Sequence, residues 1–242
     1  MELGTPFGQT YGLSHKWMKF VDVVDVDSLA HQVDERTADL HYQVGPPYIA
    51  YAKDMHSIVQ RWAELVPKVH KAKPELLSEM YAYSLAAADQ GLPHEVVNSM
   101  MISATDAYGE GWDMIDAIPN NDVCNTGITP NQSQYPLPTV LHYCQTYGVG
   151  EVLFSKYFMD SDIFTCSKPL LVEPGEDVMS PENAHKPKRG GKGKEELKPK
   201  LHKRHAFVTC AMTSAINEAA LFYKLHHCKE SNKNRNLNLA LI

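Results

Sequence analysis

Two residues in apolar surroundings have side chains that could do chemistry. Glu79 lies in the apolar stretch 76–83, and His142 follows the apolar residues 138–141. A carboxylate on an apolar helix could orient an acceptor hydroxyl or accept its proton, whereas a neutral imidazole could bind a divalent metal. From spacing alone, a hydrogen-bonded structural glutamate and a satisfied core histidine are favoured, because burial of either group requires polar partners.

Two further groups of residues could bind a ligand. Trp112 follows Gly109-Glu110-Gly111, and an exposed ring in such a flexible loop could stack on a sugar ring or a peptide proline. The alternative is a tryptophan that covers the edge of the core. Asp25 and Asp27 end an alternating segment, where paired carboxylates could hold manganese or magnesium. A solvated loop is the favoured interpretation of this pair.

Alternating strands and helices would have to position these residues. Apolar residues at every second position predict strands, and a three- or four-residue spacing predicts helices. We expect a helix from an N-cap at Asp54, kinked or split at Pro67, and a second from Pro74 to a stop at Gly91 and Pro93. The expected strands cover residues 19–27, 47–52, 96–103 and 138–144, with a long loop over 104–137 and a last helix over 205–227.

The two later helices each carry a predicted buried stripe. In the helix from Pro74 the stripe consists of Leu76, Leu77, Met80, Tyr81 and Leu85. In the helix over 205–227 it consists of Phe207, Cys210, Ala211, Ala215, Leu221, Phe222 and Leu225. Apolar residues at this spacing share one face of a helix, so both faces should point into a core.

The composition is that of an ordinary soluble globular protein. The chain has 242 residues, 43% hydrophobic and 21% charged, with a net charge of −6. The negative charge argues against nucleic acid as a partner. No stretch approaches the roughly 18 apolar residues of a membrane segment, and the first residues carry no targeting signal.

The segment 186–204 differs from the rest in being basic and rich in glycine. It offers too little apolar surface to fold alone, and we expect a disordered insertion that can be deleted without loss of stability. Contact with phosphate or an acidic polymer is the alternative. Residues 229–242 should form a polar tail.

Several blocks of the chain together resemble one family of plant and algal glycosyltransferases. The most specific block is Leu77-Ser78-Glu79-Met80-Tyr81-Ala82-Tyr83; the others are Met1–Gly4, Val44–Trp62, Met100–Ile102, Leu141–Tyr143 and Ile216–Ala219. In this order the blocks resemble the hydroxyproline O-arabinosyltransferases and peptidyl serine α-galactosyltransferases, over residues 1–228. The resemblance implies an α/β fold: an incomplete GT-A-like domain, with a mostly parallel sheet flanked by helices.

The resemblance also implies roles for individual residues. Glu79 would be catalytic, His142 a ligand of manganese or magnesium, and Tyr81, Trp112 and Tyr143 would bind the substrate. The donor would be a UDP-linked pentose or hexose, and the acceptor a hydroxyproline- or serine-rich protein of the secretory pathway or Golgi. Strand ends and helix starts of open α/β sheets converge on one crevice, so Glu79 and His142 should share a cleft with Tyr81 and Trp112 near its rim.

This resemblance covers the acceptor-side part of such a domain. The nucleotide-binding half would precede Met1, so we expect the chain as given not to transfer sugar. A truncated gene model and a non-catalytic remnant that binds glycan or peptide are the alternatives. The five cysteines have no zinc-site spacing. Because Cys166 and Cys210 lie in resembling blocks on either side of the basic insertion, we expect them to form a disulfide.

Overall fold

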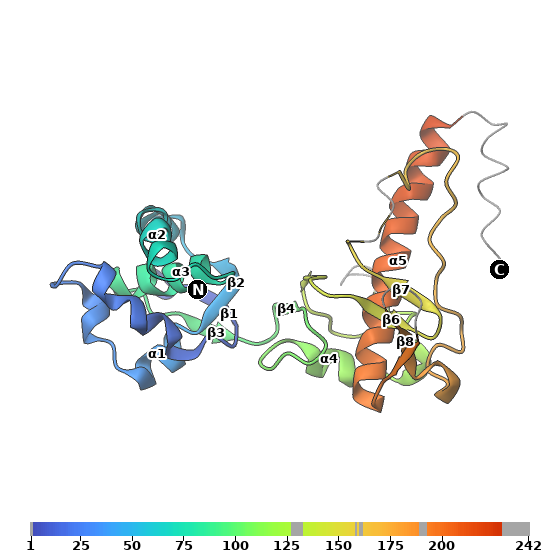
Figure 1. Ribbon diagram of the computed structural model, residues 1–242, viewed down its shortest axis with the longest axis horizontal. Helices are drawn as coiled ribbons and strands as arrows, with labels where there is room; N and C mark the ends of the chain where they lie inside the picture. The colour runs from blue at the N-terminus through green and yellow to red at the C-terminus, as the bar shows by residue number, and fades with distance from the viewer. Residues whose placement is uncertain (1, 127–132, 158, 160–161, 189–192, 229–242) are drawn as a thin grey trace. The chain divides into compact units, whose positions relative to one another are not determined.

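The computed structural model divides the chain into two compact units, drawn in Figure 1. The first consists of Met1–Met101 and Ala107–Glu110, and the second of Ile102–Asp106 and Gly111–Ile242. The structure describes every residue except 1, 127–132, 158, 160–161, 189–192 and 229–242. Each unit has its own hydrophobic core.

A three-stranded sheet and a set of helices form the first unit. The strand order is β2-β1-β3, with β1 antiparallel to β2 and parallel to β3. The elements are β1 (Phe7–Thr10), η1 (Ser14–Val23), η2 (Leu29–Gln32), α1 (Glu35–His41), β2 (Val44–Ile49), α2 (Ala52–Ala72), α3 (Ser78–Asp89) and β3 (Glu95–Val97).

The helix α3 is the centre of the first core. All but the first-turn Glu79 and the last residue, Asp89, are buried. Helices that are apolar all round are stable only when surrounded by other elements, and here α2 and η1 pack against α3. The Tyr83 ring stacks on Tyr48, with 3.7 Å between ring centroids, and its hydroxyl donates to His94 Nε2 at 2.9 Å. Burial lowers the pKa of His94 to about 4.

One long helix organises the second unit. Helix α5 (Pro199–His227) lies beside the hairpin of β6 (Tyr147–Val149) and β7 (Val152–Phe154). The remaining elements are β4 (Met101–Ile102), which spans the boundary between the units in the chain, α4 (Trp112–Asp116), η3 (Asn120–Asp122), β5 (Val140–Leu141), η4 (Pro181–Asn183), β8 (His185–Pro187) and β9 (Lys194–Glu196).

The buried face of α5 is unexpectedly polar. Buried polar residues recur along it at helical spacing; they include His202, His205, Thr209, Thr213, Asn217 and Lys224. Several of them bind the backbone of irregular segments. His202 Nε2 donates to Val178 O at 2.9 Å, and Gly148 N donates to His205 Nδ1 at 3.3 Å. Of the predicted apolar stripe, Phe222 and Leu225 are exposed instead.

The predicted α/β class is confirmed, because helices and strands occur together in both units. The described strands do not form one large, mostly parallel sheet. β1 and β3 are parallel, whereas β6–β7 and β8–β9 are antiparallel hairpins. No helix within the described ranges has the length and apolarity needed to cross a bilayer.

Several predicted elements are wrong in detail. The segment 19–27 contains the end of η1 instead of a strand. Helix α2 continues through Pro67 and is not split there, whereas a kink at Pro67 stays a prediction. Asp54 is not an N-cap: it lies in the first turn of α2 and accepts a hydrogen bond from Gly4 N at 2.8 Å. Helix α3 begins at Ser78, four residues after Pro74, which leaves Leu76 exposed.

The described residues of the basic segment form two paired strands and a helix start. Residues 185–187 pair with 194–196, and α5 begins at Pro199. Lys194 and His185 both contact the carboxylate of Glu151, with His185 Nε2 at 3.4 Å. The prediction of a disordered insertion is therefore wrong for the described residues of this segment; residues 189–192 and the predicted polar tail 229–242 lie outside them.

The disulfide pairing also differs from the expectation. Cys210 bonds to Cys124, and Cys166 bonds to Cys228, with Cα–Cα distances of 5.3 and 5.7 Å. Cys144 is a free thiol. The predicted Cys166–Cys210 bond is wrong, since each of these cysteines has another partner.

This pairing predicts the outcome of a thiol map. Without reductant, the denatured chain should take up one alkylating group, at Cys144. Proteolysis should then release linked peptides that contain Cys124 with Cys210 and Cys166 with Cys228. Mass spectrometry of alkylated protein measures both results. A linked peptide joining Cys166 to Cys210 would contradict the structure.

Candidate functional site

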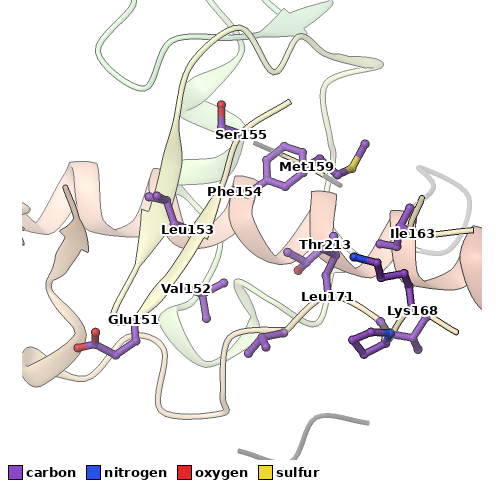
Figure 2. A pocket seen from close by; sticks show the side chains of 13 residues that line it. Glu151, Val152, Leu153, Phe154, Ser155, Met159, Ile163, Lys168, Leu171 and Thr213 are labelled. Carbon is purple, nitrogen blue, oxygen red and sulfur yellow. The ribbon is translucent and has the colours of Figure 1, made fainter. Parts of the chain in front are cut away.

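The second unit contains a pocket of about 500 Å³. Figure 2 shows it between β7 on one side and the segment after β7 on the other, with Thr213 of α5 between them. The lining is mostly apolar, with polar groups at Glu151, Ser155, Lys168 and Thr213. Its apolar residues are Val152, Leu153, Phe154, Met159, Ile163, Pro169, Leu170, Leu171 and Val172.

Asn217 fixes the far wall of this pocket. Its side-chain oxygen accepts from Leu171 N at 2.7 Å, and its nitrogen donates to Leu171 O at 2.9 Å and to Glu173 Oε1 at 2.7 Å. The side-chain amide of Asn217 thus bonds to Leu171 as the backbone of a neighbouring strand would. Both the N–H and the carbonyl group of Leu171 are satisfied in this way. Asn217 is buried, and Leu171 is partly buried.

Lys224 and a disulfide hold the preceding turn. Lys224 Nζ donates to the carbonyl oxygens of Thr165 and Lys168, the latter at 2.6 Å. Burial lowers the pKa of Lys224, although the nearby Asp162 carboxylate opposes this effect. The Cys166–Cys228 bond ties the same turn to the end of α5. Asn217 and Lys224 lie about two turns apart on α5, and Cys228 directly follows the helix. All three contacts therefore fix the pocket wall to one end of α5.

Aromatic and cationic side chains stand beside the pocket. The Tyr143 ring lies against that of the pocket residue Phe154, with 6.1 Å between centroids at 69°. Lys156 Nζ lies 5.9 Å from the centroid of Tyr143 and 5.3 Å from that of Tyr157. Tyr143 is 39% exposed and Tyr157 68% exposed. These three residues, Tyr143, Lys156 and Tyr157, are called the aromatic rim below.

The first unit contains Glu79 and Tyr81. Glu79 is exposed in the first turn of α3, where its carbonyl oxygen accepts from Trp62 Nε1 at 2.7 Å. The expectation of a carboxylate buried among apolar side chains is therefore wrong. Tyr81 is buried, with Lys19 Nζ 5.2 Å from its ring centroid, and burial raises the pKa of its hydroxyl.

His142 lies in the second unit at the end of β5, where it is exposed. Its backbone N–H donates to Ile102 O at 2.9 Å, and its carbonyl oxygen accepts from Tyr147 Oη at 3.3 Å. The described residues include no group of three or more histidine, cysteine or acidic side chains that could hold a metal ion. They do not fit a manganese or magnesium centre. A cleft shared by Glu79 and His142 stays a prediction, since the two residues belong to different units.

Trp112 is not an exposed loop residue. It starts α4, is 1% exposed, and its Nε1 donates to Ala104 O at 2.9 Å. The guanidinium carbon of Arg204 lies 5.0 Å from the centroid of its indole ring. The prediction of a ring exposed for stacking on a substrate is therefore wrong, because the core of the second unit covers it.

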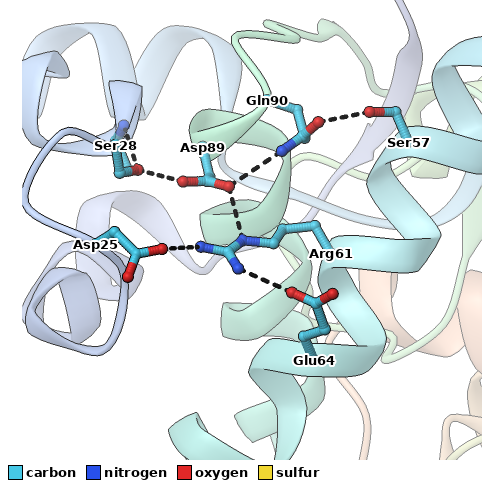
Figure 3. Close-up of polar contacts among 8 residues, drawn as sticks. Asp25, Ser28, Ser57, Arg61, Glu64, Asp89 and Gln90 are labelled. Carbon is cyan, nitrogen blue, oxygen red and sulfur yellow. Dashed lines mark hydrogen bonds and ion pairs between the residues drawn. The ribbon is translucent and has the colours of Figure 1, made fainter.

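Asp25, one of the two aspartates considered as metal ligands, makes a structural ion pair. Figure 3 shows Asp25 paired with Arg61 at 3.5 Å, within a network that joins α2 to α3. Arg61 Nε also donates to Asp89 at 2.7 Å, and Ser28 donates to the other Asp89 oxygen. Although burial raises the pKa of Asp89, these bonds hold it below its usual range. The solvated-loop interpretation of the pair agrees better with the structure, since Asp25 remains 82% exposed.

The residues that build the pocket were not predicted from the sequence. Asn217 was noted only as part of the resembling block 216–219 and Lys224 not at all, although the polar residues of α5 recur at helical spacing in the sequence. That repeat was a usable signal, because polar residues on the buried face of a helix must find partners. The segment 159–172 had no pattern that marked it as a pocket wall.

Comparison with known proteins returned no match. No protein-family model matches the chain, and neither a curated protein nor a solved structure does.

Proposed function

We propose that this chain is the acceptor-side part of a glycosyltransferase-like protein, related to the GT-A fold, and that its second unit binds an extended peptide rich in hydroxyproline or serine. The observation that carries the proposal is the apolar pocket with the aromatic rim beside it. Tyr143, selected from the sequence as a substrate-binding residue, belongs to that rim.

Extended, proline-rich peptides suit such a surface. A polyproline II segment projects its rings every third residue and loses little conformational freedom on binding. Its rings can dock against Phe154 and the aromatic rim, while apolar side chains of the pocket exclude water. Thr213 Oγ1 donates to Thr209 O at 2.8 Å, so it can accept from a hydroxyproline or serine hydroxyl, whereas Ser155, which accepts from Tyr157 N at 3.4 Å, can donate to one.

Sugar transfer itself rests on the resemblance. We infer a UDP-linked pentose or hexose as donor, and a catalytic role for Glu79 stays a prediction of the resemblance. We derive no step that uses a metal, because the described residues do not fit one. Two disulfides support a place in the secretory pathway or Golgi, since such bonds persist in oxidising compartments.

Peptide binding tests the proposal directly. We expect a fluorescent hydroxyproline-rich peptide to bind the full chain, and a glycine–serine peptide of equal length to bind more weakly. Tyr143→Ala should weaken binding by about tenfold, the magnitude expected for loss of one aromatic contact. Fluorescence polarisation gives the dissociation constants.

Tyr108→Ala is the matched control, because it removes an exposed tyrosine of the first unit. Its affinity for the peptide should equal that of the unchanged chain. Equal binding of both peptides, or equal losses in Tyr143→Ala and Tyr108→Ala, would contradict binding at the aromatic rim.

A further inference from the structure

A second cavity, of about 410 Å³, lies in the first unit. It opens where the end of β1, the end of α1 and the start of β3 come together with the returning segment Ala107–Glu110. Its lining consists of Thr10, Asp39, Leu40, His41, Gln43, His94, Glu95, Val96, Asn98, Tyr108 and Gly109. Polar side chains predominate among these residues, in contrast to the pocket in the second unit.

The walls of this cavity are held by the buried Gln9. Its side-chain nitrogen donates to Gly109 O at 2.9 Å and to Asn98 O at 3.3 Å. Thr10 Oγ1 donates to Asn98 Oδ1. Gly109 has φ +77°, and a Cβ atom there would lie 2.5 Å from Thr10 Cγ2. The returning segment is therefore packed closely on β1 at Gly109, next to Tyr108.

The cavity offers both acceptors and donors of hydrogen bonds. Asp39 is held as a carboxylate, because a hydrogen bond from Ser14 at 2.6 Å lowers its pKa against the effect of burial. The side-chain nitrogens of Gln43 and Asn98 make no hydrogen bond to another described residue, and each can donate two. His41 Nδ1 is bonded to His94 O at 3.2 Å, which leaves Nε2 as an acceptor.

Tyr108 adds an aromatic face to these groups. It is 92% exposed although the glycine that follows it is fixed against β1. An exposed aromatic ring costs solvation free energy that a stacked ligand would recover. An exposed ring beside carboxylate and amide groups suits a ligand with one apolar face and several hydroxyl groups at its edge.

We propose that this cavity binds a neutral saccharide, with its ring on Tyr108 and its hydroxyl groups bonded to Asp39, Gln43 and Asn98. The lining contains no lysine or arginine, and Asp39 and Glu95 repel anions, so nucleotide and sugar phosphates are disfavoured. This proposal is independent of peptide binding by the second unit, and either can fail without the other.

Saturation-transfer difference NMR on the full chain tests the proposal. The probes are methyl β-D-galactopyranoside, methyl β-L-arabinofuranoside and galactose 1-phosphate. We expect signals from at least one neutral glycoside, with a dissociation constant on the order of 1 mM, and a weaker signal from the phosphate. Tyr108→Ala and Gln43→Ala should each reduce the affinity at least fivefold.

Phe222→Ala serves as the control, because it removes an exposed aromatic ring of the second unit, away from the aromatic rim. It should leave the saccharide signals unchanged. No signal from either neutral glycoside would overturn the proposal. So would signals that persist in both Tyr108→Ala and Gln43→Ala, or a stronger signal from galactose 1-phosphate.

Discussion

Replacing Arg204 with alanine should lower the free energy of unfolding of the second unit by about 3–5 kcal/mol, the cost of breaking a buried ion pair. Arg204 donates to both carboxylate oxygens of Asp116, at 2.9 and 2.6 Å, and to Thr105 O at 2.7 Å. Its side chain is 7% exposed, and it also lies against the Trp112 ring. The substitution leaves a carboxylate and a carbonyl group without their main partner.

Lys200→Ala is the matched control. Lys200 pairs with the same carboxylate at 3.2 Å, but its side chain is 63% exposed. An exposed pair of this kind contributes about 0–1 kcal/mol. Urea denaturation of the two variants should therefore give very different midpoints. Similar losses in both would mean that burial does not distinguish the two pairs.

The Arg204 effect should also depend on pH. Burial raises the pKa of Asp116, but hydrogen bonds from Arg204 and Lys200 outweigh this and hold the pKa below its usual value of 3.8. A carboxyl group with a lowered folded-state pKa stabilises the fold above its unfolded pKa, and this stabilisation is lost as pH falls through the folded value. The difference between the unchanged chain and Arg204→Ala should therefore be constant near neutral pH and shrink in strong acid.

The existence of the long helices could be predicted from the sequence, but their ends could not. Apolar spacing indicated α2, α3 and α5, yet α3 begins later than Pro74 suggests. The Ser78 hydroxyl bonds to Lys73 O at 2.9 Å and Glu75 O at 2.7 Å, and so stabilises a turn where the helix was expected. Such side-chain bonds compete with the helix locally. As a result Glu79 falls in the exposed first turn.

Contacts between residues far apart in the sequence account for most of the other differences between the predicted and the observed structure. Strand β9 has no apolar stripe, but Lys194 contacts Glu151 and Leu197 N donates to Ala184 O at 2.8 Å. Disulfide partners likewise depend on tertiary structure, because spacing alone permits several connectivities. For the candidate site, the resemblance implied a role for Tyr143, which stays a prediction. The contact of Asn217 with the pocket wall could not be predicted, because it joins residues 46 positions apart.

Replacing Asn217 with alanine should destabilise the second unit by about 3 kcal/mol, because it removes three hydrogen bonds of a buried amide, each of which contributes about 1 kcal/mol. The loss corresponds to a fall of about 6–12 °C in the thermal midpoint. Differential scanning calorimetry or thermal circular dichroism measures it. Asn121→Ala, which changes an exposed asparagine of the same unit, should leave the midpoint nearly unchanged.

The same substitution should weaken peptide binding more than its effect on stability explains. Asn217 does not line the pocket; it holds both backbone groups of Leu171, which does. Without this clamp the pocket wall has more conformations, and ordering it again on binding reduces the affinity. At a temperature where Asn217→Ala remains folded, we expect weaker binding of the hydroxyproline-rich peptide, with the Tyr108-dependent saccharide signals unchanged. Full peptide affinity in the folded variant would show that the pocket wall keeps its shape without Asn217, or that the peptide binds elsewhere.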